Sequence, residues 1–316
     1  MKRQRGKGKS GFMVFALAAA AIVLWFAGAF YKHIKVENQG MQTRIAFENE
    51  EIIVKSLRQK IKEHFGEIVI TFRADGKYLD DMEKIVSGWM TCALMPTGVS
   101  DEGDYMRYQL GGYTYNCKYK NGWRDYSYTI KIKPRYYLTM GQENEVTMKV
   151  REILEELQIE EKKTKYEKLK AIYDYLYKNV GYDIIHKDNE NYHMNATAYG
   201  ALIYKRASCQ GYSVALNRLL LEAGVDNRVI TGYAQKDEKT EFHAWNLVSI
   251  QNNLYYNLDL TWNKQLESNE FFLKGEAAFS SHKRDAEFTS TYFKAEYPVS
   301  ETDYAENQQA LFSDGI

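Results

Sequence analysis

Cysteine and proline are scarce in this sequence. Its 316 residues include three of each, and the cysteines are Cys92, Cys117 and Cys209. With 45% hydrophobic and 27% charged residues, the composition indicates a folded chain long enough for two domains rather than a low-complexity one. Three is an odd number, so at least one thiol stays unpaired within the chain. Cys92 and Cys117 can pair with each other or both lie in the core.

An excess of charge of either sign is also missing. Lysine plus arginine number 42, and so do aspartate plus glutamate. This balance shows no basic patch of the kind that binds nucleic acid, so we expect no nucleic-acid partner. The neutral total hides an asymmetry, because the chain before residue 32 holds no acid and five cations, namely Lys2, Arg3, Arg5, Lys7 and Lys9.

A long run without charge near the N-terminus predicts a transmembrane helix. Gly11–Tyr31 is 21 residues of mostly apolar character, which is enough for a helix to cross a bilayer. The preceding cations make residues 1–10 a cytoplasmic tail, so the chain after Tyr31 is expected outside the cell membrane. The alternative is a cleaved signal peptide with Ala27-Gly28-Ala29 as its cleavage site. Either interpretation predicts export.

Beyond this segment the sequence predicts an α+β fold in two parts. Residues 32–64 are expected to form a stalk or helix, followed by a small α+β domain at 65–140. The elements of that domain are a strand at Glu67–Phe72, a helix at Tyr78–Trp89, and a hairpin with strands at Tyr105–Lys118 and Trp123–Tyr137 around Asn121-Gly122. A second domain is expected at 143–304, and residues 305–316 form a polar tail.

The second domain begins with helices and continues with strands. A helix is predicted around Val146–Leu157, and Thr164 with Glu167 forms a capping-box pattern at the start of the next one. Residue alternation then predicts strands at Asn227–Tyr233, Glu241–Ile250 and Leu254–Trp262. His186 and His193 come with no cysteine or carboxylate pattern, so we interpret them as surface residues and expect no metal site there.

Cys209 lies at the expected start of a helix. Val214–Ala223 carries apolar residues at helical spacing, Ser208 can cap the helix before it, and Gly224 suits a left-handed end. Backbone N–H groups and the helix dipole at such a position favour the thiolate, which is the nucleophilic form of cysteine. The simpler interpretation of an isolated thiol beside an apolar helix is an inert core residue.

A cysteine nucleophile needs a histidine to hold its proton and a third group to orient that histidine. His243 lies in one predicted strand and Asp259 in the next. With a three-residue turn at 251–253, residue 245 pairs with residue 259, and His243 and Asp259 share one face of the sheet. A two-residue turn at 252–253 sends Asp259 to the opposite face. The triad therefore requires one particular register.

Three short segments follow one another in this part of the chain. They are Cys209-Gln210-Gly211-Tyr212-Ser213, His243-Ala244-Trp245-Asn246 and Asp259-Leu260-Thr261-Trp262. In order, and in their spacing of 34 and then 16 residues, they resemble the signature motifs of the bacterial transglutaminase-like superfamily. Tyr182-Asp183 and His282-Lys283-Arg284-Asp285 are weaker points of resemblance. The likeness covers roughly residues 145–300.

The resemblance implies a papain-like α+β fold, in which the helix that bears the cysteine packs on an antiparallel sheet. It implies Cys209 as the nucleophile, His243 as general base and then acid, and Asp259 as the group that orients His243. It implies no cofactor and no metal.

Four further residues are expected to contact the substrate. Trp245 and Trp262 are candidates for the walls of the acyl site, although aromatic residues in strands are equally often core. The backbone N–H of Cys209 is the expected oxyanion donor, and Tyr199 and Gln210 are candidates for the second donor.

These features predict an exported, thiol-dependent acyl-transfer enzyme that acts on a protein or peptide at the cell envelope. An amine acceptor makes such an enzyme a cross-linker, and water makes it a hydrolase; the motifs are the same for both. The rival interpretation is a non-catalytic envelope-binding module that keeps the fold. A redox role for Cys209 is disfavoured, because no second cysteine lies beside it.

Overall fold

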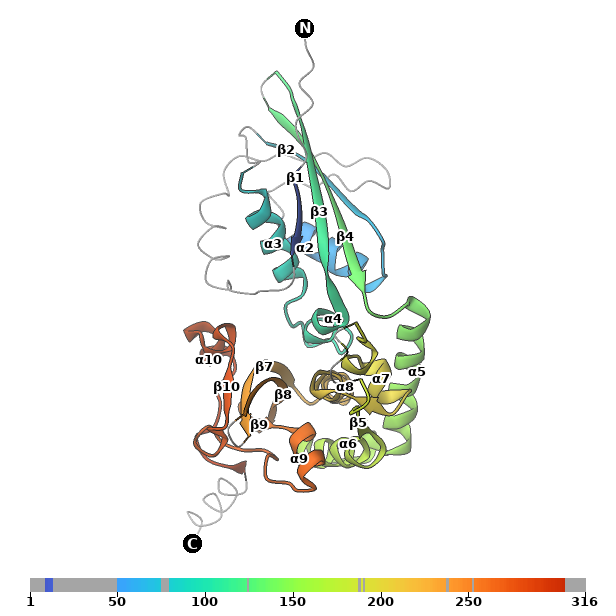
Figure 1. Cartoon of the computed structure of the whole chain (residues 1–316), viewed down its shortest axis with the longest axis vertical. Coiled ribbons are helices and arrows are strands. Elements are labelled where there is room, and N and C mark those ends of the chain that lie inside the picture. Colours follow the sequence, from blue (N-terminus) through green and yellow to red (C-terminus); the bar gives the residue numbers. More distant parts are fainter. Residues whose placement is uncertain are drawn as a thin grey trace. The chain divides into compact units, whose positions relative to one another are not determined.

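The computed structural model describes residues 9–13, 50–74, 80–123, 125–186, 189, 191–236, 239–251 and 253–304. The chain divides into two compact units (Figure 1). The first takes the residues up to Met95 and Leu110–Tyr136, and the second takes Pro96–Gln109 and everything from Tyr137 onward. Pro96–Gln109, called the inserted segment below, therefore packs in the second unit, although the sequence places it within the small domain at 65–140.

The first unit combines an antiparallel sheet with helices. Phe72 in the sheet packs edge-on against Trp89, at 6.1 Å between ring centroids, and stacks on Tyr128 at 4.9 Å. This unit is α+β, as its sequence predicts. The sheet order is β1-β3-β4-β2, and the elements are β1 (Lys9–Met13), α2 (Glu50–Lys62), β2 (Ile68–Ala74), α3 (Met82–Ala93), β3 (Leu110–Asn121) and β4 (Tyr126–Tyr136).

Two details of the predicted hairpin differ in the structure. Asn121 is the last residue of β3 and pairs with Tyr126, so the connection is longer than an Asn-Gly turn, and the Gly122 N–H donates to the Asp125 carbonyl at 2.7 Å. The predicted first strand also began too early. Residues 104–109 form helix α4 (Asp104–Gln109), which belongs to the inserted segment.

The second unit is built around helix α8 (Cys209–Glu222), whose residues from Gly211 to Leu220 are all buried. The helix packs against the antiparallel sheet β10-β7-β8-β9, as the resemblance implied. The strands of this sheet are β7 (Asn227–Lys236), β8 (Lys239–Gln251), β9 (Leu254–Leu258) and β10 (His282–Arg284). The remaining elements include α5 (Met140–Glu156), α6 (Lys165–Asn179), β5 (Gly181–Tyr182), α7 (Ala198–Leu202), β6 (Arg206–Ala207), α9 (Leu260–Leu266) and α10 (Thr291–Glu296).

Two of three helix-end signals in the second unit act as predicted, and the third does not. Thr164 and Glu167 form the predicted capping box of α6, and Gly224 adopts the left-handed conformation, with φ of 76°, after α8. Ser208 occupies the N-cap position of α8, but its side chain does not cap the helix. Its hydroxyl lies 3.3 Å from the Asn195 carbonyl instead.

The β8–β9 register agrees with the one that the triad requires. Asn246 pairs with Leu258 and Ser249 with Tyr255, which is the register that would set residue 245 opposite 259. The turn itself is short, because Gln251 pairs with Leu254. A register shift between Ser249 and Gln251 compensates for it. A bulge supplies an extra residue to one strand. It therefore returns the Asp259 side chain to the face of the sheet that holds His243, whereas a short turn alone would have put it on the opposite face.

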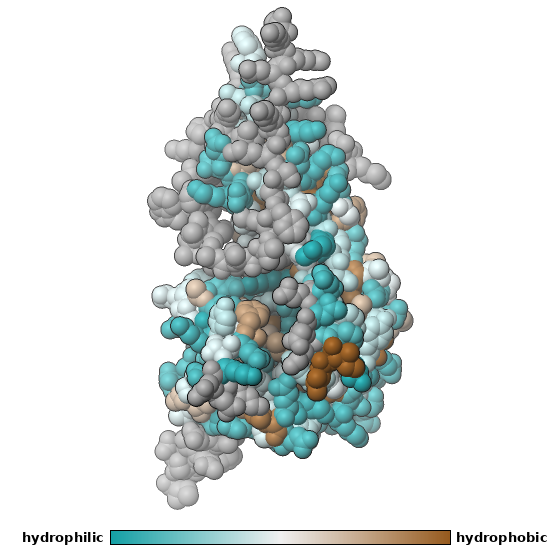
Figure 2. All heavy atoms as spheres, viewed as in Figure 1, coloured by the Kyte–Doolittle hydropathy of each residue, from teal (hydrophilic) through white to brown (hydrophobic). Residues whose placement is uncertain are grey.

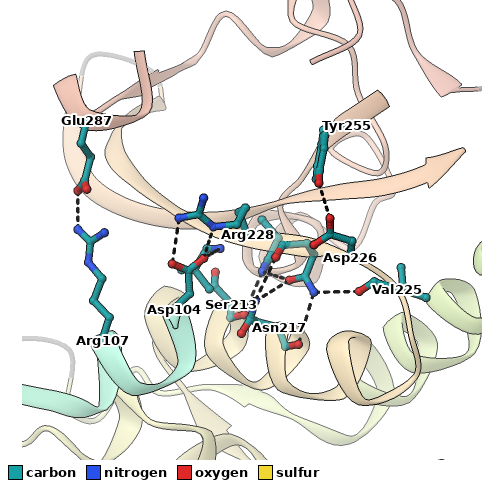
Figure 3. Close-up of polar contacts among 12 residues, drawn as sticks. Asp104, Arg107, Ser213, Asn217, Val225, Asp226, Arg228, Tyr255 and Glu287 are labelled. Atoms are coloured by element: carbon teal, nitrogen blue, oxygen red, sulfur yellow. Dashed lines mark hydrogen bonds and ion pairs between the residues drawn. The ribbon is translucent and has the colours of Figure 1, made fainter. Parts of the chain in front are cut away.

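The inserted segment is tied to β7 by a buried ion pair (Figure 3). The Asp104 carboxylate accepts hydrogen bonds from Nε and Nη2 of Arg228, at 2.7 and 3.1 Å, and from the Val229 N–H at 2.9 Å. The Arg228 guanidinium lies 4.4 Å from the centre of the Tyr297 ring. Because a six-residue helix is marginal alone, we infer that these contacts hold α4 in place.

Within the described residues no helix is both long and apolar enough to cross a membrane. The transmembrane helix predicted at Gly11–Tyr31 lies outside the described residues apart from Gly11–Met13, which belong to β1 and pair with β3. The polar tail at 305–316 also lies outside them.

Candidate active site

Buried amides fix the cysteine helix relative to the sheet. Asn246 of β8 donates from Nδ2 to the carbonyl of Ser213 in α8, at 3.0 Å. Asn217 of α8 donates to Oδ1 of Asn227 in β7, also at 3.0 Å (Figure 3). Because unpaired amides are costly to bury, these bonds favour one position of α8 against β7 and β8.

Cys209 is the first residue of α8 and is half-buried. A close backbone approach holds this end of the helix. The Ser208 N–H donates to the Asn195 carbonyl at 2.8 Å, and a Cβ at Gly211 would lie only 2.2 Å from that same oxygen. Glycine at position 211 therefore lets the chain at Asn195 touch the first turn of α8.

His243 and Asp259 form a buried pair. Nε2 of His243 lies 2.7 Å from Oδ2 of Asp259, and Oδ1 of Asp259 accepts the Trp262 N–H at 3.0 Å. The second contact makes Asp259 the N-cap of α9. The predicted strand Leu254–Trp262 was wrong in its second half, because an aspartate that caps a helix ends β9 at Leu258.

The charges of the pair reinforce each other. Burial alone would lower the pKa of His243, but Asp259 and Cys209 raise it to about 10. Burial alone would raise the pKa of Asp259, but His243 and His282 hold it well below its ordinary value. At neutral pH the pair is therefore an imidazolium beside a carboxylate.

The Cys209 side chain also interacts with this imidazole. A hydrogen bond between the Cys209 and His243 side chains contributes to the raised pKa of His243. Since Nε2 faces Asp259, Nδ1 is the ring nitrogen left for the sulfur. Cys209, His243 and Asp259 thus form one connected chain of side chains.

The other two cysteines lie in different surroundings, and all three are free thiols. Burial raises the pKa of Cys117 to about 11 and also raises the pKa of Cys92. Cys92 and Cys117 therefore do not form the disulfide that the sequence left open. Both lie in the first unit, where they provide internal references for the reactivity of Cys209.

Of the four residues expected to contact the substrate, two make hydrogen bonds directed elsewhere. The Gln210 amide donates to the Tyr108 carbonyl at 3.0 Å and to the Ala196 carbonyl at 3.2 Å. The Tyr199 hydroxyl donates to Glu145 at 2.9 Å. In this structure the Gln210 side-chain amide and the Tyr199 hydroxyl therefore donate to other groups.

The two tryptophans differ from each other. Trp245 is 1% exposed and donates from Nε1 to Asn257 at 3.3 Å, so it belongs to the core. Trp262 is 9% exposed, and its ring centre lies 5.4 Å from that of His243. Trp262 therefore shields the imidazole from water on one side.

The phenol of Tyr182 was not among the predicted site residues. Burial raises its pKa, and Cys209 raises it further, so the hydroxyl lies within electrostatic reach of the sulfur. Tyr182 pairs with Ala207, two residues before the cysteine. Its signal in the sequence was its place in Tyr182-Asp183, one of the weaker points of resemblance.

His243, Asp259 and His282 are also a group whose ligand atoms lie within 4.8 Å of one another, as a metal site would require. Both histidines direct Nε2 at Oδ2 of Asp259, at 2.7 and 3.1 Å. Hydrogen bonds account for this arrangement, and we assign no metal to it.

Hydrophobic side chains also reach the surface of the second unit. Ile184 and Ile185, which follow β5, are 68% and 72% exposed. Figure 2 shows such hydrophobic areas, in brown, between the teal hydrophilic ones.

Comparisons with known proteins gave matches of two kinds, to solved structures and to a family model. Among solved structures, one described as "a TGase" matches with a TM-score of 0.35 and 13% identity, covering 70% of this chain and 56% of its own. The chain thus spans just over half the length of that protein. A "putative cysteine protease" from Cytophaga hutchinsonii matches with a TM-score of 0.33 and 14% identity, covering 55% of this chain and 69% of its own.

No curated protein matches the chain. The family model described as the transglutaminase-like superfamily matches residues 152–260. This range includes Cys209, His243 and Asp259. By that match, residues 152–260 are similar to a transglutaminase-like superfamily domain.

Proposed function

We propose that this chain is a thiol-dependent acyl-transfer enzyme whose nucleophile is Cys209. The observation that carries the proposal is the placement of His243 between the Asp259 carboxylate and the Cys209 side chain. The transglutaminase-like match over residues 152–260 supports the same class of enzyme.

The geometry supports the following reaction. The Cys209 thiolate attacks an amide carbonyl carbon, and the carbonyl electron pair moves onto oxygen, where the Cys209 N–H is positioned to donate. The C–N bond then breaks as the departing amine takes the proton of His243, which leaves a thioester. An acceptor amine or water gives its proton to His243 and attacks the thioester, and the thiolate departs. An amine acceptor yields a cross-link, and water yields hydrolysis.

The proposed substrate is a protein or peptide at the cell envelope. This part of the proposal rests on the apolar run Gly11–Tyr31 and the cations before it, which support a membrane anchor with the N-terminus in the cytoplasm.

The test is iodoacetamide alkylation of the full-length chain between pH 5 and pH 10, read at each cysteine by mass spectrometry. We expect Cys209 to stay reactive near pH 6, where an ordinary thiol with a pKa of about 8.5 is almost fully protonated. His243→Ala should lower the Cys209 rate at pH 6 by about 100-fold. Cys92 and Cys117 are the internal references and should not change.

If Cys209 follows the pH dependence of Cys92, or if His243→Ala leaves its rate unchanged, the catalytic assignment fails. A non-catalytic binding module would then be the better description of the fold.

A further inference from the structure

A second imidazole contacts the carboxylate of the proposed triad. His282 of β10 directs Nε2 at Oδ2 of Asp259 from 3.1 Å, and both side chains are fully buried. His243 reaches the same oxygen from 2.7 Å. The reaction proposed above uses only His243, so it does not account for the presence of His282.

Ser281 indicates which nitrogen of His282 carries the proton. A carboxylate can only accept hydrogen bonds, so Nε2 of His282 donates to Asp259. Nδ1 then accepts from the Ser281 hydroxyl, whose oxygen lies 2.9 Å away. Burial and the nearby His243 together lower the pKa of His282, although Asp259 acts to raise it. Asp259 and His243 are thus the titratable groups that act on His282, and its ring is neutral.

Aromatic rings enclose His282 and restrict its orientation. Phe279 stacks on the imidazole with 3.9 Å between ring centres, and Trp262 lies at 4.5 Å. Trp245 and Phe271 follow at 5.1 and 5.6 Å. A donor held in this way keeps its direction without a change of rotamer.

Close strand pairing brings His282 to this place. In the pairing of β10 with β7, Arg284 lies opposite Gly232, and a Cβ at Gly232 would lie 2.1 Å from the Lys283 carbonyl oxygen. The Gln235 N–H also donates to the Ser281 carbonyl at 2.8 Å. The missing side chain at Gly232 therefore allows β10 to approach the sheet closely enough for His282 to reach Asp259.

We propose that His282 is a positioning residue that, as an Nε2–H donor, holds Oδ2 of Asp259 toward His243. The proposal rests on the function proposed above. Two donors on one oxygen spread its charge, so Asp259 orients the imidazolium rather than taking its proton. His282 acts through Asp259 while the proton on His243 is gained and lost.

Three substitutions distinguish the role of the His282 hydrogen-bond donor from that of its aromatic ring. His282→Phe keeps an aromatic ring in the enclosure and removes the donor, whereas His282→Gln keeps an N–H donor at the end of a side chain of similar reach. Ser281→Ala removes only the hydroxyl that fixes the tautomer. His186→Phe, at a histidine outside the proposed triad, is the matched control. Urea unfolding of each variant checks that it folds.

The readout is the pH profile of Cys209 alkylation in the full-length chain, which needs no knowledge of the substrate. We expect His282→Phe to lower the rate at pH 6 by about 10- to 100-fold, the range expected for a lost hydrogen bond to a charged group. His282→Gln should restore most of the rate, Ser281→Ala should lower it a few-fold, and His186→Phe should match the wild type.

A wild-type profile in His282→Phe overturns the positioning role while leaving the proposed function intact. If His282→Phe does not fold, equal rates in Ser281→Ala and wild type, together with a large loss in His282→Gln, overturn it in the same way. If His243→Ala leaves the alkylation rate of Cys209 at its wild-type value, the proposed function itself is refuted.

The tautomer gives an independent measurement. Two-bond proton–nitrogen correlation spectra of histidine-labelled protein should show the proton of His282 on Nε2 and none on Nδ1 at pH 7. A doubly protonated ring, or a proton on Nδ1, contradicts the proposal.

Discussion

Two aspartate–histidine pairs in the second unit have nearly the same nitrogen–oxygen distance in different surroundings. His243 lies 2.7 Å from Asp259, and His186 lies 2.9 Å from Asp183. Both carboxylates are buried, but the His243 ring is 7% exposed and the His186 ring is 34% exposed. His186 follows β5 in a loop and stacks on Tyr192, whereas His243 lies in β8 with Cys209 on its far side.

The comparison shows that an Asp–His distance alone does not identify a catalytic pair. Asp183 accepts hydrogen bonds from Asn195 and from the His186 backbone, which ties the loop to the chain segment that supports Ser208. We therefore interpret Asp183–His186 as structural. The His243–Asp259 pair differs in two features. Its imidazole is buried, and a thiol lies beside it at a helix N-terminus.

The largest difference between the two pairs should appear when each carboxylate becomes an amide. We expect Asp259→Asn to lower the Cys209 alkylation rate near pH 6 on the order of 1,000-fold, because an amide can neither balance the imidazolium nor hold its tautomer. Asp183→Asn should change that rate less than about threefold, because its role does not include the imidazole of the triad. Equal losses in the two variants would contradict the distinction.

The pairs should also differ in how their stability depends on pH. The raised pKa of His243 stabilises the fold fully below its ordinary 6.5, and this contribution is lost as the pH rises toward 10. The depressed pKa of Asp259 stabilises the fold above about pH 4, its ordinary range, and this contribution is lost as the pH falls. The pair therefore contributes most between about pH 4 and 6.5.

Urea unfolding should show this window. Asp259→Ala should cost about 3 to 5 kcal/mol of unfolding free energy at pH 5.5, because it leaves a buried imidazolium unpaired, and less at pH 9.5. The cost of Asp183→Ala in unfolding free energy should not become smaller at pH 9.5. A cost for Asp259→Ala that is the same at both pH values would count against the ion pair.

A smaller effect is expected at Gln210, which adjoins Cys209 without belonging to either pair. Gln210→Ala removes two hydrogen bonds to backbone carbonyls and should cost about 1 kcal/mol in unfolding free energy. Its Cys209 alkylation rate should stay within about threefold of wild type. A loss as large as that of His243→Ala would mean that the Gln210 amide acts on the sulfur after all.

Local sequence patterns predicted helix α8 and the start of α6, but not the helix that Asp259 caps. The capping box at Thr164, the left-handed Gly224 and the apolar spacing of α8 are decided by neighbouring residues, so sequence was sufficient for them. For Asp259, sequence left two options, one for each turn length, for the face of the sheet on which its side chain lies. The register shift between Ser249 and Gln251 decides between them, and no turn residue signals it.

Contacts between distant parts of the chain were the ones that sequence analysis missed. Tyr199 and Gln210 were expected to face the substrate, but Glu145 and the Tyr108 carbonyl, far away in sequence, accept their hydrogen bonds. His282 lies 23 residues from Asp259 in a three-residue strand. Only the tertiary packing of β10 against β7 reveals that contact.

The inserted segment has a consequence for any attempt to isolate the second unit by truncation. The chain passes between the units after Met95, Gln109 and Tyr136, so a fragment that starts at Tyr137 lacks helix α4. Such a fragment would keep Arg228 in the core without the carboxylate of Asp104, an unpaired charge that costs about 3 to 5 kcal/mol. The smallest self-sufficient form of this domain therefore begins no later than Pro96, and it carries the first unit's hairpin with it.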